Sequence, residues 1–445
     1  RTLGEFHMIM IDEAHTLPAN VRKAGACEVS SATLMGLVRS ASRILDEMDS
    51  RVERLMKEGN ALAAELNDDL TTLVRSGPRM KPGEVFKLNK EADPVENTGD
   101  MLIAWAKSLK NHLEKHTTSA NVQASLKAKR LTGRADSFIA SVAQVKLHKS
   151  GTARWVEEKT PGTSARNQDP YWAACASPVN VGGLLAANLW TAPVMADEED
   201  EMAQALKEAG EIPEVEMYDL TVVAVSATLP ARFGYQAGLK AENVEYPSPF
   251  DAAYGRSVFY VAKPDEEGTR FLYPGWSRGT RAKFNAGLHQ EWAAQQAVDL
   301  VSASGGGALV LSANSAGGKA YAKALRAASR GRWTVYSQWD GLSGGQMVDK
   351  WRAEESSVLV GTKSFMTGVD APGPTNRLTI IDRIPRSAGN PEDDARVEAL
   401  MEAMATDKWS ADRFVYVSDA SLLLEQGAGR LIRSVKDTGM VALLD

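Results

Sequence analysis

Two adjacent carboxylates follow the first apolar run of the chain, and their types and spacing suit nucleotide chemistry. The run Phe6–Ile11 is followed directly by Asp12-Glu13-Ala14-His15. Such a run predicts a buried parallel strand, and ligands bind at the carboxyl ends of parallel strands. One carboxylate there can hold Mg2+ while its neighbour orients and deprotonates a water, as nucleotide hydrolysis requires. A charged turn would explain the same residues.

A hydroxyl-containing tripeptide, Ser226-Ala227-Thr228, ends another predicted strand at Leu220–Val225. Small hydroxyl side chains at a strand end can relay hydrogen bonds between neighbouring loops. They suit the N-cap of a following helix equally well. The tripeptide alone therefore leaves both interpretations open.

A third segment, Gly361 to Asp370, follows the predicted strand Val358–Val360 and reads Gly-Thr-Lys-Ser-Phe-Met-Thr-Gly-Val-Asp. Glycines allow the backbone to approach a phosphate, and the hydroxyl groups and Lys363 can bind one. The segment therefore predicts a phosphate contact at the end of its strand.

A fourth segment, Gln426 to Arg433, contains two arginines three residues apart, which share one helical face. Two guanidinium groups beside Gln426 suit a triphosphate whose charge grows in the transition state. A surface helix would explain Arg430 and Arg433, but not the glycines at 427 and 429.

Apolar periodicity predicts the elements that position these groups. Leucine, valine and methionine recur every three or four residues from Ser30 to Arg75, which predicts a long helical hairpin, and helical texture resumes from Met101 to Leu147. After Leu220, strands alternate with helices, which is typical of an α/β domain with a parallel sheet. The predicted strands there are 308–311, 334–336, 358–360, 378–381 and 414–417, and the predicted helices are 291–304, 319–329 and 392–405.

Composition excludes several classes of protein. The 445 residues are 44% hydrophobic and 24% charged, which suits a folded chain of about three domains. No run approaches the roughly 20 apolar residues of a membrane helix, and nothing in the sequence indicates secretion. The two cysteines, Cys27 and Cys175, are too few for a four-thiolate metal site, so we expect reduced thiols in a cytoplasmic protein.

Charge is distributed unevenly along a chain whose net charge is −6. Between Trp105 and Arg154, ten basic residues stand against two acids, and four of the ten are crowded together: Lys127, Lys129, Arg130 and Arg134. With Trp105, Phe138 and Trp155 interspersed, the stretch could form a wall for single-stranded nucleic acid or a solvated basic helix face. The acidic run from Asp197 to Glu216 predicts a solvated loop or helix.

The four chemical segments, in this order, resemble motifs II, III, V and VI of superfamily 2 helicases. The details resemble the XPD/DinG-like DNA helicases, which have a DEAH box and a large helical insertion before the Ser-Ala-Thr motif. Further segments that resemble this family are Pro178 to Val181, Leu189-Trp190, Ser248 to Asp251, Ile380 to Pro385 and Ala442 to Asp445.

The resemblance implies ATP and Mg2+ as cofactors. Asp12 would hold Mg2+, and Glu13 would be the general base. His15, Ser226 and Thr228 would couple the state of the nucleotide to the DNA site. The other implied nucleotide contacts are Gly368 and Asp370 in the cleft and Gln426, Arg430 and Arg433 at the γ-phosphate, with Arg430 or Arg433 as the arginine finger.

The resemblance also implies single-stranded or tailed DNA as a partner, with 5′→3′ movement. Thr362, Lys363 and Ser364 would face phosphate. Ser312 follows the predicted strand at 308–311, where motif IV belongs, and would touch the nucleic-acid backbone. The four crowded basic residues Lys127, Lys129, Arg130 and Arg134 would guide the strand.

The resemblance divides the chain into four segments. Residues 1–20 would be the C-terminal part of a first RecA-like P-loop motor domain, and residues 217–245 the return to it. Residues 21–216 would be a large, mainly α-helical arch-type insertion, and residues 246–445 a complete second RecA-like domain. The expected fold class is therefore α/β, with the first motor domain partial.

The family's phosphate-binding Walker A loop, G-x-x-x-x-G-K-[ST], does not occur in this sequence. The nearest segment, Gly317-Gly318-Lys319-Ala320, has Ala where Mg2+ needs a hydroxyl, so it predicts a helix start. In the family this loop and the iron–sulfur cysteines precede the DEAH box. We therefore expect a separate chain or N-terminal segment to supply them, and little ATP hydrolysis without it. Cys27 and Cys175 do not support an iron–sulfur cluster.

The leading hypothesis is an ATP-dependent DNA helicase in the cytoplasm of a bacterial or phage-infected cell, associated with the nucleoid. One alternative is a catalytically incomplete nucleic-acid-binding subunit. Others are an RNA-directed motor and an ATPase independent of nucleic acid. A nuclease is a further alternative, but the sequence shows no additional carboxylate-rich α/β domain that could supply nuclease activity.

Overall fold

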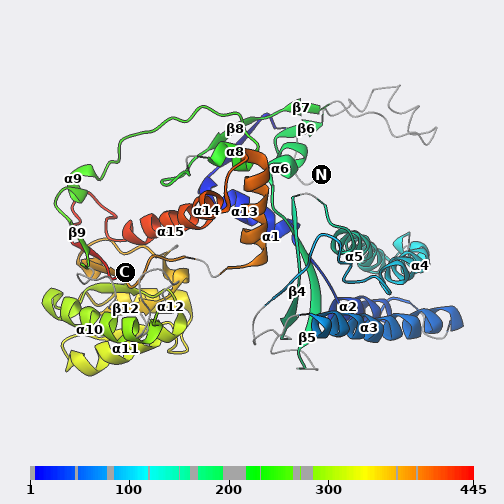
Figure 1. Cartoon of the computed structure of the whole chain (residues 1–445), viewed down its shortest axis with the longest axis horizontal. Coiled ribbons are helices and arrows are strands. Elements are labelled where there is room, and N and C mark those ends of the chain that lie inside the picture. The colour runs from blue at the N-terminus through cyan, green and yellow to red at the C-terminus, as the bar shows by residue number, and fades with distance from the viewer. Residues whose placement is uncertain are drawn as a thin grey trace. The chain divides into compact units, whose positions relative to one another are not determined.

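The computed structural model is a mixed α/β protein with two compact units (Figure 1). The first unit comprises Arg1–Ala241 and Gly389–Asp412, and the second comprises Glu242–Ala388 and Arg413–Asp445. The structure describes residues 6–45, 49–77, 85–118, 121–149, 151–160, 169–193, 217–230, 232–263, 271, 284–366, 369–386 and 389–445.

The first unit contains the two strands that carry the DEAH and Ser-Ala-Thr segments. Strand β1 (Met8–Ile11) pairs in parallel with β8 (Thr221–Ala224), as expected from their apolar runs. The expected burial of β1 is wrong for Met8 and Met10, which are 56% and 68% exposed, because no described element covers their face of the pair. The opposite side packs with α6 (Gly182–Asn188) and α8 (Phe233–Ala237).

Four helices of the first unit confirm the two predicted helical stretches. They are α2 (Ser31–Ala41), α3 (Ser50–Ser76), α4 (Gly99–Thr117) and α5 (Val122–Lys146). Apolar side chains at helical spacing, such as Leu34, Leu66 and Leu109, form one buried core. The α2–α3 and α4–α5 pairs lie side by side (Figure 1).

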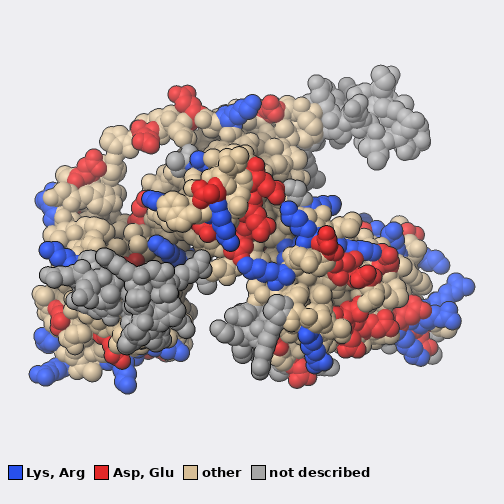
Figure 2. All heavy atoms as spheres, viewed as in Figure 1, with Lys and Arg blue, Asp and Glu red and all other residues tan. Residues whose placement is uncertain are grey.

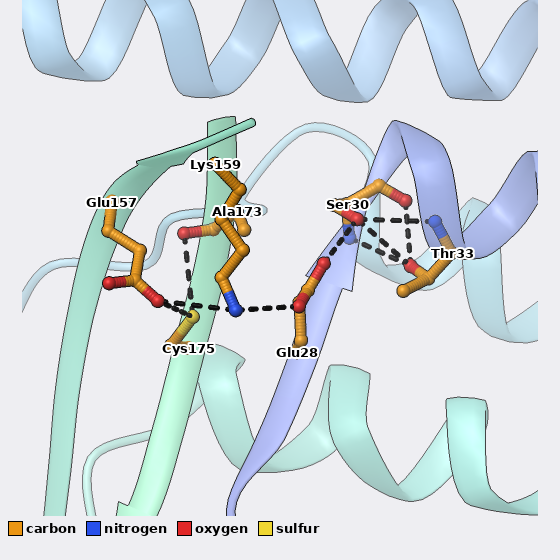
Figure 3. A network of polar contacts seen from close by, with 7 residues as sticks. All are labelled: Glu28, Ser30, Thr33, Glu157, Lys159, Ala173 and Cys175. Carbon is orange, nitrogen blue, oxygen red and sulfur yellow. Dashed lines mark hydrogen bonds and ion pairs between the residues drawn. The ribbon is translucent and has the colours of Figure 1, made fainter. Parts of the chain in front are cut away.

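A four-stranded antiparallel sheet in the same unit was not predicted. Its strand order is β2 (Cys27–Ser30), β5 (Tyr171–Pro178), β4 (Thr152–Lys159) and β3 (Phe86–Lys87). A polar network joins three of the strands: Lys159 Nζ of β4 lies 2.8 Å from Glu28 Oε2 of β2, and Cys175 Sγ of β5 lies 3.5 Å from Glu157 Oε1 of β4 (Figure 3). Burial raises the pKa of the Cys175 thiol in this network, which keeps it protonated.

The second unit is built on a six-stranded, wholly parallel sheet. Its order is β11 (Val335–Ser337), β12 (Val358–Gly361), β10 (Ala308–Leu311), β13 (Leu378–Ile381), β14 (Met440–Leu443) and β9 (Val258–Val261). Alternate residues of each strand face opposite sides. Helices α10 (Ala286–Ser304) and α11 (Ser315–Ser329) cover one face, and α12 (Gly344–Arg352) and α15 (Ser418–Ala428) contribute to the core on the other. The α/β class with helices on both faces is thereby confirmed.

Two predictions for the C-terminal third have different outcomes. Residues 414–417 were expected to form a strand, but Arg413–Val417 is a π-helix. The apolar run FVYV carries no periodicity that separates strand from helix, and here it continues the helical path between α14 (Lys408–Asp412) and α15. The predicted helix at 392–405 forms as α13 (Pro391–Met404) and belongs to the first unit.

The remaining described elements are short: η1 (Ala14–Thr16), α1 (Leu17–Gly25), β6 (Thr191–Pro193), β7 (Met217–Asp219), α9 (Asp251–Tyr254), η2 (Lys363–Phe365) and η3 (Pro374–Asn376). The acidic run Asp197 to Glu216 lies outside the described residues. Among the described helices, none combines the length and apolarity that crossing a membrane requires.

Candidate nucleotide and nucleic-acid sites

The parallel pairing of β1 with β8 places motifs II and III at the same edge. Ile11 lies opposite Ala224, so both strands end together. Backbone hydrogen bonds continue past the strands, from Val225 N to Ile11 O at 2.8 Å and from Ala14 N to Val225 O at 3.0 Å. The DEAH turn and the Ser-Ala-Thr turn are thus fixed to each other through their main chains.

Side chains complete this connection through His15. Its Nδ1 lies 2.8 Å from Ser226 Oγ and 3.3 Å from Glu13 Oε2, and its side chain is only 7% exposed. The Ser226 hydroxyl also lies 3.3 Å from Thr228 N, which donates to it. The alternative N-cap role of the tripeptide is not realised, because the next described helix, α8, begins at Phe233.

The two acidic residues of the box remain exposed. Asp12 Oδ1 accepts a hydrogen bond of 2.9 Å from Glu13 N. Glu13 adopts the left-handed backbone conformation with φ 50°, which is unusual for a residue with a Cβ. Thr16 Oγ1 supports the turn by donating to Glu13 O at 2.9 Å. The turn presents two hard oxygen donors to solvent, as an Mg2+-nucleotide would need.

In the second unit, Arg430 of motif VI holds the backbone of motif V. Its Nε donates to Met366 O at 2.9 Å, and its Nη1 donates to Val369 O at 2.8 Å. Its neighbour Arg433 lies 3.1 Å from Asp370 Oδ1 through Nε. The two arginines and Asp370 are therefore brought together. Gly368, another predicted contact, lies outside the described residues.

The turn that carries Arg433 depends on a carboxylate that sequence reasoning missed. Asp437 is buried and accepts hydrogen bonds from Arg433 N, Ser434 N, Ser434 Oγ and Gly373 N at 2.7–3.1 Å. Burial alone would raise its pKa, but these hydrogen bonds outweigh burial and hold the pKa below its usual value. Asp437 therefore fixes both the Arg433 turn and the loop that follows motif V.

Gln426 and Gly427 lie near the end of α15, where the helix passes close to the sheet. A Cβ added at Gly427 would lie 3.3 Å from Ile381 Cδ1 and 3.5 Å from Leu311 Cδ1. An added Cβ would thus be in tight contact with Ile381, so the glycine allows the helix to pass this close to the strands. Gln426 is half-buried beside this contact.

Ser312, at the motif IV position, is fully buried. Its hydroxyl donates to Asp382 Oδ2 at 2.9 Å, and the same oxygen accepts from Tyr321 OH at 3.0 Å. Ala313 N donates to the other carboxylate oxygen. Burial raises the pKa of Asp382, and these three hydrogen bonds oppose the rise. The Ser312 side chain thus holds Asp382, and it has no exposed surface for a direct contact with nucleic acid.

The start of motif V is anchored by a residue that the sequence did not single out. Gln338 Oε1 accepts hydrogen bonds from both the backbone N and the hydroxyl of Thr362, each at 2.9 Å. Gln338 directly follows β11, and Thr362 directly follows β12. The next two residues, Lys363 and Ser364, are exposed at the same edge of the sheet.

The crowded basic residues of α5 are exposed, but the aromatic residues predicted to accompany them are mostly not. Lys127, Lys129, Arg130 and Arg134 lie at the surface. Trp105 and Phe138 are 4% and 5% exposed within the helical core, so neither ring can stack on a base. The face in Figure 2 carries acidic as well as basic side chains over α2–α5. Any surface in this region that binds a polyanion would therefore be confined to the basic residues of α5.

Comparison with known proteins shows that this chain is similar to bacterial proteins named as helicases. The Helicase C-terminal domain family matches residues 297–445. The ATP-dependent helicase DinG of Mycobacterium tuberculosis H37Ra is 27% identical over 444 residues, which is 100% of this chain and 58% of that protein. The ATP-dependent DNA helicase YoaA of Escherichia coli K12 is 24% identical over 444 residues, covering 100% of this chain and 60% of that protein. The predicted resemblance to DinG-like helicases is thereby confirmed over the whole length of the chain.

Solved XPD structures share the fold of this DinG-like chain. Xpd4 of S. tokodaii has a TM-score of 0.54 at 14% identity, covering 98% of this chain and 71% of that one. A second structure, titled XPD helicase, has a TM-score of 0.52 at 13% identity and covers 98% and 64%. The DinG-like chain spans a little over half the length of the curated relatives it matches, 58% for the mycobacterial protein.

Proposed function

We propose that this DinG-like chain is the motor portion of an ATP-dependent DNA helicase that moves 5′→3′ on single-stranded DNA. The observation that carries the proposal is the His15–Ser226 hydrogen bond of 2.8 Å. It joins the turn with two exposed carboxylates to the turn after β8, so a change at a nucleotide can reach a second loop. A motor needs such a connection, because hydrolysis must be coupled to movement.

For the chemistry, Asp12 would hold Mg2+, which would help bind and polarise the phosphates of ATP. Asp12 Oδ1 accepts from Glu13 N, and the exposed side chain leaves its other oxygen available. Glu13 would take a proton from the attacking water, since its side chain is 66% exposed beside His15.

Gln426, Arg430 and Arg433 would meet the γ-phosphate. Arg430 binds two carbonyl oxygens of motif V and Arg433 pairs with Asp370. Either guanidinium would exchange these contacts for phosphate oxygens when nucleotide binds. Such an exchange would release the motif V loop, which carries the proposed DNA contacts Thr362, Lys363 and Ser364. The two arginines thereby offer a second route from nucleotide to DNA.

The chain has no Walker A loop in its sequence, so the proposed activity needs a segment that supplies one. We expect negligible ATP turnover from these 445 residues alone and DNA-stimulated turnover when a Walker A-bearing segment is added. In the reconstituted protein, Glu13→Gln should leave ATP binding nearly intact and lower turnover about 100-fold or more. An unchanged rate in that variant would remove the base role of Glu13.

The same experiment separates the alternative functions. A catalytically incomplete nucleic-acid-binding subunit would bind single strands but show no turnover after reconstitution. An RNA-directed motor would be stimulated by RNA in preference to DNA. Rapid turnover from the chain alone would contradict the proposed need for a Walker A segment.

A further inference from the structure

A surface groove beside α11 has a composition that the four helicase motifs do not explain. Its volume is about 310 Å3, and its lining includes Lys319, Lys323, Arg326, Trp339 and Asp340. One wall is helix α11, and the other is the turn that follows the edge strand β11. The whole groove lies within the second unit.

The cations of the groove are arranged along one face of α11. Lys319, Lys323 and Arg326 are spaced by four and three residues, so they lie above one another on the helix. Arg326 is engaged by Asp340 and by the carbonyl oxygen of Val335. Both lysines are exposed, and neither forms an ion pair within the part of the chain that the structure describes. Two positive charges therefore remain available in the groove.

Trp339 supplies an aromatic wall that is fixed in position. A Cβ added at Gly318 would lie 2.2 Å from Cη2 of the Trp339 ring, so the indole packs directly on the helix backbone at this glycine. The Gly317-Gly318-Lys319-Ala320 segment lacks the Walker A pattern. Its Gly318 leaves space for the indole, and its Lys319 is the first of the three cations along the helix. A ring held in place loses little conformational entropy when a ligand stacks on it.

The groove adjoins the proposed DNA-contacting edge of the sheet. Trp339 directly follows Gln338, whose side-chain oxygen accepts both hydrogen bonds from Thr362 at the start of motif V. The exposed Lys363 and Ser364 come next along the chain. A basic track beside an aromatic platform is the combination that binds single-stranded nucleic acid with little sequence preference.

We infer that the groove between α11 and Trp339 binds single-stranded DNA, with Lys319 and Lys323 on successive phosphates and a base stacked on Trp339. The inference rests on the proposed function, because it extends the motif V contacts along the sheet edge. It adds a strand contact that belongs to none of the four motifs. The charge of the two lysines complements a polyanion, and the indole selects one that carries bases.

The test is the affinity of the full chain for a fluorescently labelled thymidine oligonucleotide, measured by anisotropy over a range of salt concentrations. Lys319→Ala/Lys323→Ala should weaken binding and reduce the salt slope by about 1.4 log units, or 0.7 for each lost phosphate contact. Lys350→Ala/Lys436→Ala removes the same charge elsewhere on the second unit and should leave affinity and slope close to those of the wild type.

Trp339 is tested with a second oligonucleotide in which bases are replaced by abasic sites. The wild type should prefer the base-bearing strand, and Trp339→Ala should weaken binding to it about fivefold or more and largely remove the preference. Trp339→Phe should retain most of the preference, since a phenyl ring also stacks. A ring with a purely structural role would not alter discrimination between the two oligonucleotides.

Three results would overturn the inference, and they have different consequences. If the wild type binds the oligonucleotide and the lysine and Trp339 variants bind it with the same affinity, the groove is not a DNA-binding site. The proposed function would still stand. Equal competition by polyglutamate would make the groove a surface for acidic protein segments. Absence of wild-type binding to any single strand would overturn both the groove and the DNA-binding part of the proposed function.

Discussion

His15 Nδ1 and Ser226 Oγ lie 2.8 Å apart, although 211 residues separate them in the sequence. The intervening chain forms the helical pairs and the antiparallel sheet, and it returns in register because β8 pairs in parallel with β1. The two strands thus define one rigid edge that carries both turns. Motifs II and III are therefore in direct contact through these two side chains.

A double-mutant cycle on this pair should measure that contact. His15→Ala and Ser226→Ala each remove one partner, so their effects on the free energy of unfolding should not add. We expect a coupling energy of about 0.5–1.5 kcal/mol, the usual net value of one hydrogen bond. Urea unfolding of the chain and its three variants provides the measurement. Additive effects would show that the bond contributes nothing, and the proposed coupling route would lose its support.

Replacing Arg430 with Lys should loosen the motif V loop. Lysine keeps the charge but lacks the planar fork that reaches Met366 O and Val369 O together. We expect a loss of about 1–3 kcal/mol in local stability, seen as faster hydrogen exchange of backbone amides near Met366 and Val369. Exchange in α3 serves as the internal reference, because it lies in the other unit. Unchanged exchange near motif V would contradict a structural role for Arg430.

Asp437→Asn should destabilise the second unit in a pH-dependent way. The folded pKa of Asp437 lies below its unfolded value of roughly 3.9, so the charged carboxylate stabilises the fold. This stabilisation is fully present above the unfolded pKa and is lost as pH falls through the lowered folded pKa. The variant should therefore cost about 1–3 kcal/mol at pH 7 and progressively less below pH 4. The free energy of unfolding of the wild type and the variant should be measured from pH 7 to pH 3. A difference between the two that stays constant over this range would contradict the linkage.

The basic residues of α5 should contribute to DNA binding only if they contact phosphates. Replacing Lys127, Lys129, Arg130 and Arg134 with Ala should weaken binding to all sequences and flatten the salt slope by about 0.7 log units per lost contact. Arg51, Arg54, Lys57 and Arg75 on α3 form a control set with the same charge. If both quadruple variants bind alike, the α5 residues are a solvated helix face, and strand guidance comes from the motor unit.

The sequence predicted those parts of the fold whose cause is local. The three- and four-residue spacing of Leu34, Leu66 and similar side chains predicted the helices, because periodic burial needs no knowledge of the partner. The short runs of β-branched residues in the second unit likewise predicted its strands. Strand β5 was missed because its segment YWAACASP is rich in alanine, and its partners β2 and β4 lie far from each other in the sequence.

The candidate site was predicted by motif, whereas the residues that support it were not. Gln338 and Asp437 are ordinary polar residues in the sequence, and only the fold places them against Thr362 and the Arg433 turn. Trp105 was misjudged for the same reason. Its position in a basic stretch suggested a stacking platform, but its helix turns the ring inward, where Nε1 donates to Leu55 O at 2.8 Å.

The most direct test of the central claim is strand separation by the chain reconstituted with a Walker A-bearing segment. The substrate is a labelled duplex with a 5′ single-stranded tail, compared with the same duplex carrying a 3′ tail. We predict ATP-dependent unwinding of the 5′-tailed duplex, little unwinding of the 3′-tailed one, and loss of activity in Glu13→Gln. Strand separation that persists without ATP or in Glu13→Gln, or none on either duplex despite DNA binding, would contradict a helicase motor.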